Sequence, residues 1–365
     1  MGVLSCLALA AFALGALLGD GPGDADRKAS VASTLPPKLL AGERIVVGVE
    51  GTSVGAGLRS AIGEGRVAGV VLFAANFPSR AAGARLIAQL QAIPRPPKLR
   101  DPLLVMVDQE GGQVKRLSGA PTASAATMGT RGATFSREQG QRTAANLRDV
   151  GVNVDLAPVL DVGRSGGVIA ETERSFGATA ARVSATAIPF AEALQSGGIA
   201  ATGKHFPGFG DARENTDFSV ERIDLSKSEL RAVDEKPYEA FIGAGGKLVM
   251  LSTAVYPAFS DRPAAFTRAI ATGELRNRLG FEGVTVTDAL ETPAVEHFGS
   301  TPEAALAGAR AGADLLLYAK LSTGQVAWKA LVKKLRIGAL DRPEFEQAVD
   351  RVLDLRAELP KPKGR

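Results

Sequence analysis

The chain has 365 residues, of which 45% are hydrophobic and 22% are charged, the composition of an ordinary globular protein. Its 43 basic and 39 acidic residues give a formal charge of +4, and the two densest basic clusters, Lys333–Arg336 and Lys361–Arg365, contain no aromatic residue. This pattern argues against nucleic acid as a partner; it favours a solvated surface or a mild attraction to an anionic polymer or cell surface. The single cysteine, Cys6, excludes disulfide bonds within the chain.

The N-terminal segment is apolar. Val3–Leu18 reads VLSCLALAAFALGALL, about the length of the apolar part of a signal peptide and slightly short for a membrane span. We predict a signal peptide or an N-terminal anchor over residues 1–18; the run continues past Cys6, which argues against lipidation there. Residues 19–39 are rich in Gly, Pro, Ser and Asp and are predicted to be a flexible linker. We therefore expect an exported protein, extracellular or associated with the cell envelope.

From residue 40 onward, short apolar runs alternate with helical patterns. Eight runs of roughly four to seven residues are mostly rich in Val, Ile and Leu, as buried parallel strands are. The predicted strands are Ile45–Val49, Val67–Phe73, Leu103–Val107, Val152–Leu156, Ile199–Gly203, Leu248–Leu251, Val284–Thr287 and Ala313–Leu317.

The segments between these strands have helical periodicity, and a further helical segment, Ser322–Glu358, follows the last strand. Eight successive strand–helix units without an internal break predict an α/β protein, a (β/α)8 TIM-like barrel over residues 40–360. The C-terminal helices are expected to pack outside it, and no second domain is expected. The predicted helices within the barrel are Arg80–Ala92, Arg137–Val150, Ala180–Ser196, Ser228–Ile242, Arg268–Leu279 and Pro302–Ala311.

Polar residues follow four of the predicted strands. A barrel of this type places its chemistry at the carboxyl ends of the strands, so these residues are expected to surround one cavity. A lone aspartate after a strand more often caps the next helix, so the prediction of a site depends on the four clusters together. They are Asp108-Gln109-Glu110 after the third strand, Asp161 after the fourth, Lys204-His205 after the fifth and Asp288 after the seventh.

Motifs of several other active sites are absent from the sequence. The only histidines, His205 and His297, have no partner at metal-ligand spacing, so no zinc site is expected and only carboxylate-bound magnesium is left open. There is no G-x-S-x-G elbow and no phosphate-binding loop; GVEGTSVGAG after the first strand is predicted to form tight turns. Carboxylates with Lys, Arg and His around a cavity remain, which is typical of a sugar site without metal or cofactor.

Four segments carry a family resemblance: DQEGGQVKRL (Asp108–Leu117), RSFG (Arg174–Gly177), KHFPGFG (Lys204–Gly210) and GFEGVTVTDAL (Gly280–Leu290). In this order on a barrel they resemble the family 3 glycoside hydrolases, in particular the single-domain β-N-acetylglucosaminidase (β-N-acetylhexosaminidase) branch, over roughly residues 40–358. The resemblance implies a retaining mechanism with Asp288 as the nucleophile that forms a covalent glycosyl intermediate. It further implies that the non-reducing sugar is held by Asp108 as a hydroxyl acceptor and by the donors Arg116, Arg174, Lys204 and His205.

The loop after the fifth strand departs from this family. In the β-N-acetylglucosaminidase branch it reads KHFPGHG, then four residues, then Asp-Ser-His, and that Asp–His pair is the general acid/base. Here the same loop length ends in Asn215-Thr216-Asp217, and Phe209 replaces the second histidine of the motif. Before VYP in the sixth unit, where the family commonly has a histidine, this chain has Thr253 and Ala254. The proton-transfer step is therefore the part of the mechanism that the resemblance does not supply.

An aspartate in this position must hold its proton to act as an acid. Raising an aspartate pKa from about 3.9 to about 6 requires roughly 2.9 kcal/mol, which burial under a closed loop can supply and nearby cations would oppose. We expect Asp217 to be the acid/base. The alternatives are another carboxylate, Glu214, Asp211 or Glu173, or a weak proton step that favours good leaving groups or transfer to another acceptor.

Two functions of different class remain. The first is an exported β-N-acetylhexosaminidase-like hydrolase that acts on amino-sugar glycans derived from cell walls or chitin, with a transglycosylase or phosphorylase as a variant. The second is a catalytically impaired barrel that binds sugars or peptidoglycan fragments. The retained Asp288 favours the first, and the missing Asp–His pair favours the second.

Overall fold

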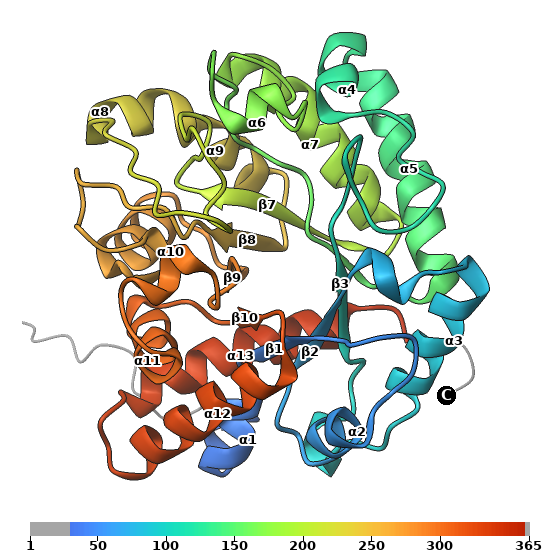
Figure 1. Ribbon diagram of the computed structural model, residues 1–365, viewed down its shortest axis with the longest axis vertical. Helices are drawn as coiled ribbons and strands as arrows, with labels where there is room; N and C mark the ends of the chain where they lie inside the picture. The colour runs from blue at the N-terminus through green and yellow to red at the C-terminus, as the bar shows by residue number, and fades with distance from the viewer. Residues whose placement is uncertain (1–29, 362–365) are drawn as a thin grey trace, which may run out of the picture.

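The computed structural model describes residues 30–361, and a parallel eight-stranded sheet forms its centre (Figure 1). The strands lie in the order β10-β1-β2-β3-β6-β7-β8-β9, and a parallel bridge between Val286 and Leu315 joins the two ends. The predicted (β/α)8 barrel is therefore confirmed. Its strands are β1 (Ile45–Gly48), β2 (Gly69–Leu72), β3 (Leu104–Val107), β6 (Val154–Asp155), β7 (Ala200–Phe206), β8 (Leu248–Leu251), β9 (Val284–Thr287) and β10 (Leu316–Tyr318).

All eight predicted strands are present, and their side chains alternate between two buried clusters. One cluster, which includes Val46, Val71 and Met106, packs inside the barrel. The other, which includes Val47 and Val70, packs against the surrounding helices. Because both faces of each strand are buried, the strands are continuous apolar runs in the sequence. These runs are the signal from which the strands are predicted.

Helices surround the barrel, and each predicted helix coincides with one or more helical segments (Figure 1). Two of them, Ser228–Ile242 and Arg268–Leu279, contain π-helical turns, at Leu230–Asp234 and Ala269–Arg278. The α-helices are α1 (Pro37–Gly42), α2 (Ala56–Gly63), α3 (Arg80–Gln91), α4 (Ala125–Arg131), α5 (Ala133–Val150), α6 (Val168–Glu171), α7 (Ala180–Ser196), α8 (Lys227–Glu229), α9 (Lys236–Gly243), α10 (Pro293–Glu296), α11 (Thr301–Ala311), α12 (Leu321–Arg336) and α13 (Arg342–Glu358).

Two elements were not predicted from the sequence. Helix α2 follows the glycine-rich turn after β1, and its eight residues include two glycines and no charge pattern that would have marked it. A short antiparallel hairpin, β4 (Gln109–Gly111) and β5 (Val114–Lys115), follows β3. Its two- and three-residue strands carry no apolar alternation, so sequence periodicity could not reveal it.

The predicted signal peptide or anchor, residues 1–18, lies outside the described residues, and so do residues 19–29 of the expected linker. Residues 30–39 of that linker are described, and they are structured. A 3-10 turn at Ala32–Thr34 and helix α1 follow one another, and the side chains of Ala32 and Leu35 are buried. Leu35 supplies apolar contact and Pro37 starts α1, two features that the Gly, Pro and Ser content obscured. Within residues 30–361, no helix has the length and apolar character to cross a membrane.

Candidate active site

A cavity of about 200 Å³ lies at the carboxyl ends of the strands. It is smaller than the roughly 300–1,000 Å³ of sites for drug-sized ligands and suits a ligand about the size of one sugar ring. Apolar side chains such as Phe73, Leu156 and Met250 form part of its wall. All seven site residues predicted from the sequence line this one cavity: Asp108, Arg116, Arg174, Lys204, His205, Asp217 and Asp288.

An ion-pair cluster forms one wall of the cavity. Lys204, at the end of β7, places its Nζ 2.7 Å from Asp108 and 2.7 Å from Glu110. The guanidinium of Arg174 donates two hydrogen bonds of 2.8 Å to Glu110, and Arg116 lies 3.3 Å from Asp108. The hairpin β4–β5 makes this possible, because it carries Glu110 in one strand and turns the chain so that Arg116 returns to Asp108.

Burial and charge act in opposite directions on this cluster. Burial favours the neutral amine of Lys204, but the attraction of Asp108 and Glu110 is stronger, and the pKa of Lys204 is raised. Burial favours the neutral acid at Glu110, but Arg174 and Lys204 outweigh it and hold its pKa well below the usual range. The pKa of Asp108 is lowered in the same way by Lys204 and Arg116. All three groups are therefore charged at neutral pH.

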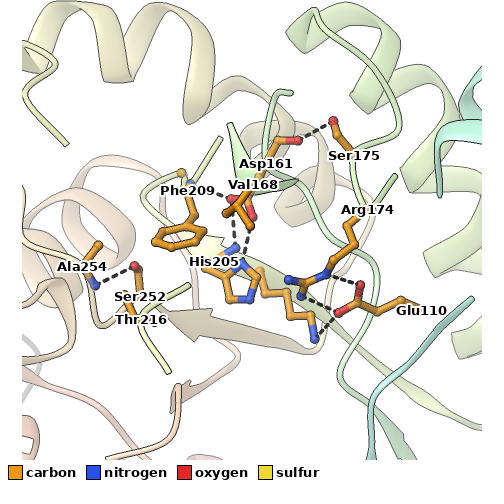
Figure 2. A network of polar contacts seen from close by, with 12 residues as sticks. Glu110, Asp161, Val168, Arg174, Ser175, His205, Phe209, Thr216, Ser252 and Ala254 are labelled. Carbon is orange, nitrogen blue, oxygen red and sulfur yellow. Dashed lines mark hydrogen bonds and ion pairs between the residues drawn. The ribbon is translucent and has the colours of Figure 1, made fainter. Parts of the chain in front are cut away.

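His205 is oriented by Asp161, which follows the short strand β6. Its Nδ1 lies 2.8 Å from one carboxylate oxygen of Asp161, and its backbone N–H donates to the other at 3.1 Å (Figure 2). The N–H of Phe209 donates to that second oxygen at 2.7 Å, and the Phe209 ring meets the imidazole edge-on. Asp161 thus fixes both the ring and the start of the loop that follows β7.

Asp288 follows the last residue of β9. Its backbone N–H donates to Leu251 O at 3.0 Å, and its carboxylate accepts a hydrogen bond of 2.8 Å from the N–H of Ala289. Burial raises the pKa of Asp288 above the usual value of an aspartate; His205 lowers it and the negative charge of Asp217 raises it. Among residues 30–361, no side-chain cation is hydrogen-bonded to this carboxylate, unlike Asp108, so its oxygens remain available to a ligand.

Asp217 lies on the loop after β7, and its side chain is exposed at the edge of the cavity, so the expected burial under a closed loop is not observed. Its carboxylate accepts a 2.9 Å hydrogen bond from the Asn215 side chain, whose oxygen accepts the N–H of Asp217 at 3.0 Å. The residue between them, Thr216, is buried and hydrogen-bonded to Thr253 at 2.9 Å. The alternatives Asp211, Glu214 and Glu173 are absent from the cavity wall.

Comparison with known proteins identifies the family of the chain. Residues 45–355 match the glycosyl hydrolase family 3 N-terminal domain. The chain belongs to glycosyl hydrolase family 3. An "uncharacterized secreted glycosyl hydrolase" of Arthroderma benhamiae is 34% identical over 341 residues, 91% of this chain and 96% of that protein. A "beta-hexosaminidase" of Thioalkalivibrio sulfidiphilus is 35% identical over 283 residues, 75% of this chain and 79% of that protein.

Solved family 3 structures have the same fold. A family 3 β-N-acetylglucosaminidase from Paenibacillus superposes with a TM-score of 0.84 at 31% identity, covering 90% of this chain and 65% of that one. A β-N-acetylhexosaminidase from Beutenbergia cavernae gives a TM-score of 0.82 at 30% identity, covering 88% of this chain and 99% of that one. This chain therefore spans about two thirds of the first structure and nearly all of the second.

Two residues that build this family 3 site were not among those singled out as site residues from the sequence. The sequence marks Glu110 and Asp161 only as polar residues after strands, yet Glu110 joins Arg174 to Lys204. Figure 2 shows Glu110 paired with Arg174, and Asp161 beside His205, which it orients. Neither lines the cavity. Their position after a strand was the available signal, but the partners lie 64, 94 and 44 residues away along the chain, and only the barrel brings them together.

Metal ligation has no candidate in the part of the chain that the structure describes: no group of three or more His, Cys, Asp and Glu side chains is arranged to hold an ion. The remaining question of the site is how three cavity carboxylates, Asp108, Asp217 and Asp288, divide the chemistry among them.

Proposed function

We propose that this family 3 protein is a retaining β-N-acetylhexosaminidase, which removes terminal amino-sugar residues from cell-wall or chitin-derived glycans through a covalent glycosyl–aspartate. One observation carries the proposal. Of the three carboxylates that line the cavity, Asp108 is paired with two cations, and only Asp288 and Asp217 are left without one. Retaining hydrolysis needs two carboxylates in separate roles, one nucleophile and one acid/base.

Asp288 is the nucleophile in this proposal. It is held by the backbone at the end of β9, close enough to the wall formed by Lys204 and His205 for both to affect its pKa. Its oxygen attacks the anomeric carbon while the glycosidic C–O bond breaks, so the sugar becomes an ester of Asp288. The cluster around Lys204 supplies charged donors and acceptors for the sugar hydroxyls, and its ion pairs are already formed before the sugar arrives.

Asp217 transfers the proton. In the first step it donates a proton to the leaving oxygen; in the second it accepts one from the water that attacks the anomeric carbon and frees Asp288. Its place at the edge of the cavity, where the leaving group emerges, supports this role over Asp211, Glu214 and Glu173, which do not line the cavity. The same position in the family loop carries the acid/base histidine.

The proposal is tested with a panel of 4-nitrophenyl glycosides and nuclear magnetic resonance of the product. We expect release from the N-acetyl-β-glucosaminide in preference to the β-glucoside, with the β-anomer of the sugar appearing first. Binding of N-acetylglucosamine without turnover of any glycoside would support the sugar-binding barrel instead. An α-anomer as the first product would exclude the double-displacement mechanism.

Glycosyl transfer is a second candidate, favoured by the exposure of Asp217 and by its local partner Asn215. An acceptor such as phosphate needs little help from a base, so transfer to phosphate would bypass the step in which Asp217 activates water. Glycosyl phosphate would then form in phosphate buffer faster than free sugar forms without phosphate. Equal rates of sugar release in both buffers, with no glycosyl phosphate, would leave hydrolysis as the reaction.

Export of the protein is also part of the proposal. The apolar run Val3–Leu18 supports it, and the Arthroderma relative carries the word "secreted" in its description. Edman sequencing or peptide mapping of the protein recovered from its host would show whether the chain starts at Met1 or after the apolar run.

A further inference from the structure

One outer face of the barrel is basic and apolar at once. It is formed by helix α12 and the start of α1, which lie side by side at the lower edge of the molecule (Figure 1). Helix α12 has four cationic side chains and no acidic residue over its sixteen positions. The α12 face, as we call it, consists of Lys38, Trp328, Lys329, Lys333, Arg336 and Ile337, which line one shallow hollow.

The cations of this face are unpaired. Lys329, Lys333 and Arg336 are spaced at i, i+4 and i+7, so they project from one side of the helix, and all three are exposed. Neither these three nor Lys38 lies within 4.0 Å of a carboxylate in the described part of the chain, whereas the next helix, α13, pairs its Arg342 and Arg351 with acids. The α12 face therefore presents a positive charge that no carboxylate among residues 30–361 neutralises.

Apolar side chains lie among these cations. Ile337, directly after α12, is 64% exposed. Trp328 is half-buried, and its indole N–H already donates to Lys38 O at 2.9 Å, so its ring can enter an apolar medium without losing a hydrogen bond. Tryptophan beside lysine and arginine is the combination that proteins place at the boundary between lipid and water.

The N-terminal part of the chain leads to this face. Arg342, the first residue of α13, donates to Leu35 O at 3.2 Å, and Trp328, in the middle of α12, donates to Lys38 O, so residues 35–38 lie between the start of α13 and the middle of α12. The apolar run Val3–Leu18 is separated from Ser30 by eleven residues, which span at most about 40 Å when extended. Any membrane that holds the apolar run therefore lies within reach of the α12 face.

We propose that the α12 face docks the domain on an anionic phospholipid membrane, with the cations at the headgroups and Trp328 and Ile337 in the interfacial layer. A membrane fits better than a soluble anionic polymer, because a polymer would use the charges but leave the exposed apolar side chains in water. A single weak membrane signal gives reversible binding, and two together give stable attachment. The apolar N-terminal run and the α12 face would be two such signals.

The chain offers a direct probe, since Trp328 is its only tryptophan. The experiment adds the full chain to vesicles of phosphatidylcholine alone or with phosphatidylglycerol and measures quenching of tryptophan emission by acrylamide. We expect protection and a blue shift on the anionic vesicles only, and loss of both in roughly 1 M NaCl, where the Debye length is about 3 Å. Insertion of the N-terminal run alone would leave Trp328 equally quenched on both.

A matched pair of variants completes the test. K329E/K333E/R336E is expected to abolish the protection and to weaken binding to anionic vesicles by about a hundredfold or more, since each cation near such a surface contributes several-fold. R85E/R131E/R142E changes the net charge equally on the side of α3, α4 and α5 and should keep the protection. Both variants should hydrolyse a soluble aryl glycoside like the parent, which shows that the barrel is intact.

Three results would overturn the proposal. One is equal quenching of Trp328 on neutral and anionic vesicles by the parent chain. Another is protection that survives in K329E/K333E/R336E. A third is the same protection by a soluble polyphosphate without vesicles, which would identify an anionic polymer as the occupant of the α12 face.

Discussion

The two sides of the cavity are built differently. On the barrel side, the Lys204 side chain is 2% exposed and contacts Asp108 and Glu110, which lie 96 and 94 residues away in the chain. On the loop side, Asp217 is exposed, and its side-chain hydrogen bond goes to Asn215, two residues away. The neighbouring Phe218 is 77% exposed, whereas Thr216 is buried and hydrogen-bonded to Thr253, so the loop is anchored at Thr216 while Asp217 and Phe218 face solvent.

This difference separates two tasks of the site. Contacts between distant segments fix the groups that would bind the sugar, so little ordering is needed when the sugar arrives. The side chain proposed for proton transfer, Asp217, is hydrogen-bonded to Asn215 of its own loop, and the loop is anchored beside it by the hydrogen bond between Thr216 and Thr253. Under the proposed roles, the groups that would bind the sugar follow the family resemblance, and the group that would transfer the proton departs from it. The two sides of the cavity should respond differently to substitution.

The largest effect is expected for Asp288→Asn. An amide cannot form the glycosyl ester, so kcat/KM should fall by about 10⁴-fold or more for every substrate, a loss of more than about 5 kcal/mol of transition-state stabilisation. Steady-state kinetics with an aryl glycoside measures it. The control is Asp155→Asn in β6: burial raises the pKa of Asp155 well above the usual value, so the neutral amide resembles its native state, and most activity should remain. Equal losses in both variants would mean that the site tolerates no change of a buried aspartate, and the loss in Asp288→Asn would then not identify a nucleophile.

Asp217→Asn should separate substrates by leaving group. Loss of a general acid costs about 10²–10⁴-fold for alkyl glycosides, whose leaving oxygen needs a proton, and much less for the first step with 4-nitrophenyl glycosides. Parallel assays of the two substrate types measure the ratio. Asp211→Asn, on the same loop but outside the cavity wall, should affect both substrates equally and weakly. If Asp217→Asn reduces both rates by the same factor, Asp217 is not the acid.

Glu110→Gln tests the barrel side. Removal of one partner of a buried ion pair lowers the free energy of unfolding by about 3–5 kcal/mol. In this variant Arg174 and Lys204 would keep their charges without Glu110 to balance them. Chemical unfolding at pH 7 measures the loss. The difference in the free energy of unfolding between parent and variant should shrink as the pH falls below about 4. Below that pH the Glu110 carboxyl of the unfolded chain takes up a proton while that of the folded chain stays ionised, so the stability gained from its depressed pKa is progressively lost.

Glu192→Gln is the matched control for that measurement. It removes a surface pair with Arg137 of similar length, 2.7 Å, whose side chains are 48% and 39% exposed, and such pairs contribute about 0–1 kcal/mol. Similar losses for the buried and the exposed pair would contradict the distinction between the two sides of the cavity.

The smallest effect is a shift in the pH profile. Asp288 must be ionised to attack, so kcat/KM falls as the pH drops through its pKa. Burial raises this pKa and the negative charge of Asp217 raises it further, against His205. Asp217→Asn removes one of these causes, so the acid limb for an activated aryl glycoside should move to lower pH, by less than about one unit. An unchanged limb, or a move to higher pH, would show that the two carboxylates do not interact.

Much of this structure could be predicted from the sequence. The strands are predictable because strands buried on both faces are continuous apolar runs, and Asp108, Lys204, His205 and Asp288 because a barrel gathers the residues that follow its strands. Arg116, Arg174 and Asp217 follow only from the resemblance to family 3. The hairpin β4–β5 and helix α2 escaped because they are short and lack periodic patterns. The roles of Glu110 and Asp161 depend on contacts between distant segments, and residues 30–39 are ordered by packing that their composition does not show.

The most direct test of this mechanism is the covalent intermediate itself. The probe is a 5-fluoro glycosyl fluoride that keeps the 2-acetamido group. Its 5-fluorine destabilises the positively charged transition states of both steps, and its anomeric fluoride is a good leaving group that still allows the first step, so the glycosyl ester should accumulate. Mass spectrometry of the intact protein and of its peptides then locates the sugar. We predict one added glycosyl group per chain, on the peptide that contains Asp288, and none on the Asp288→Asn variant. A folded parent chain that stays unlabelled, or a label on another residue, would contradict the assignment of Asp288 as the nucleophile.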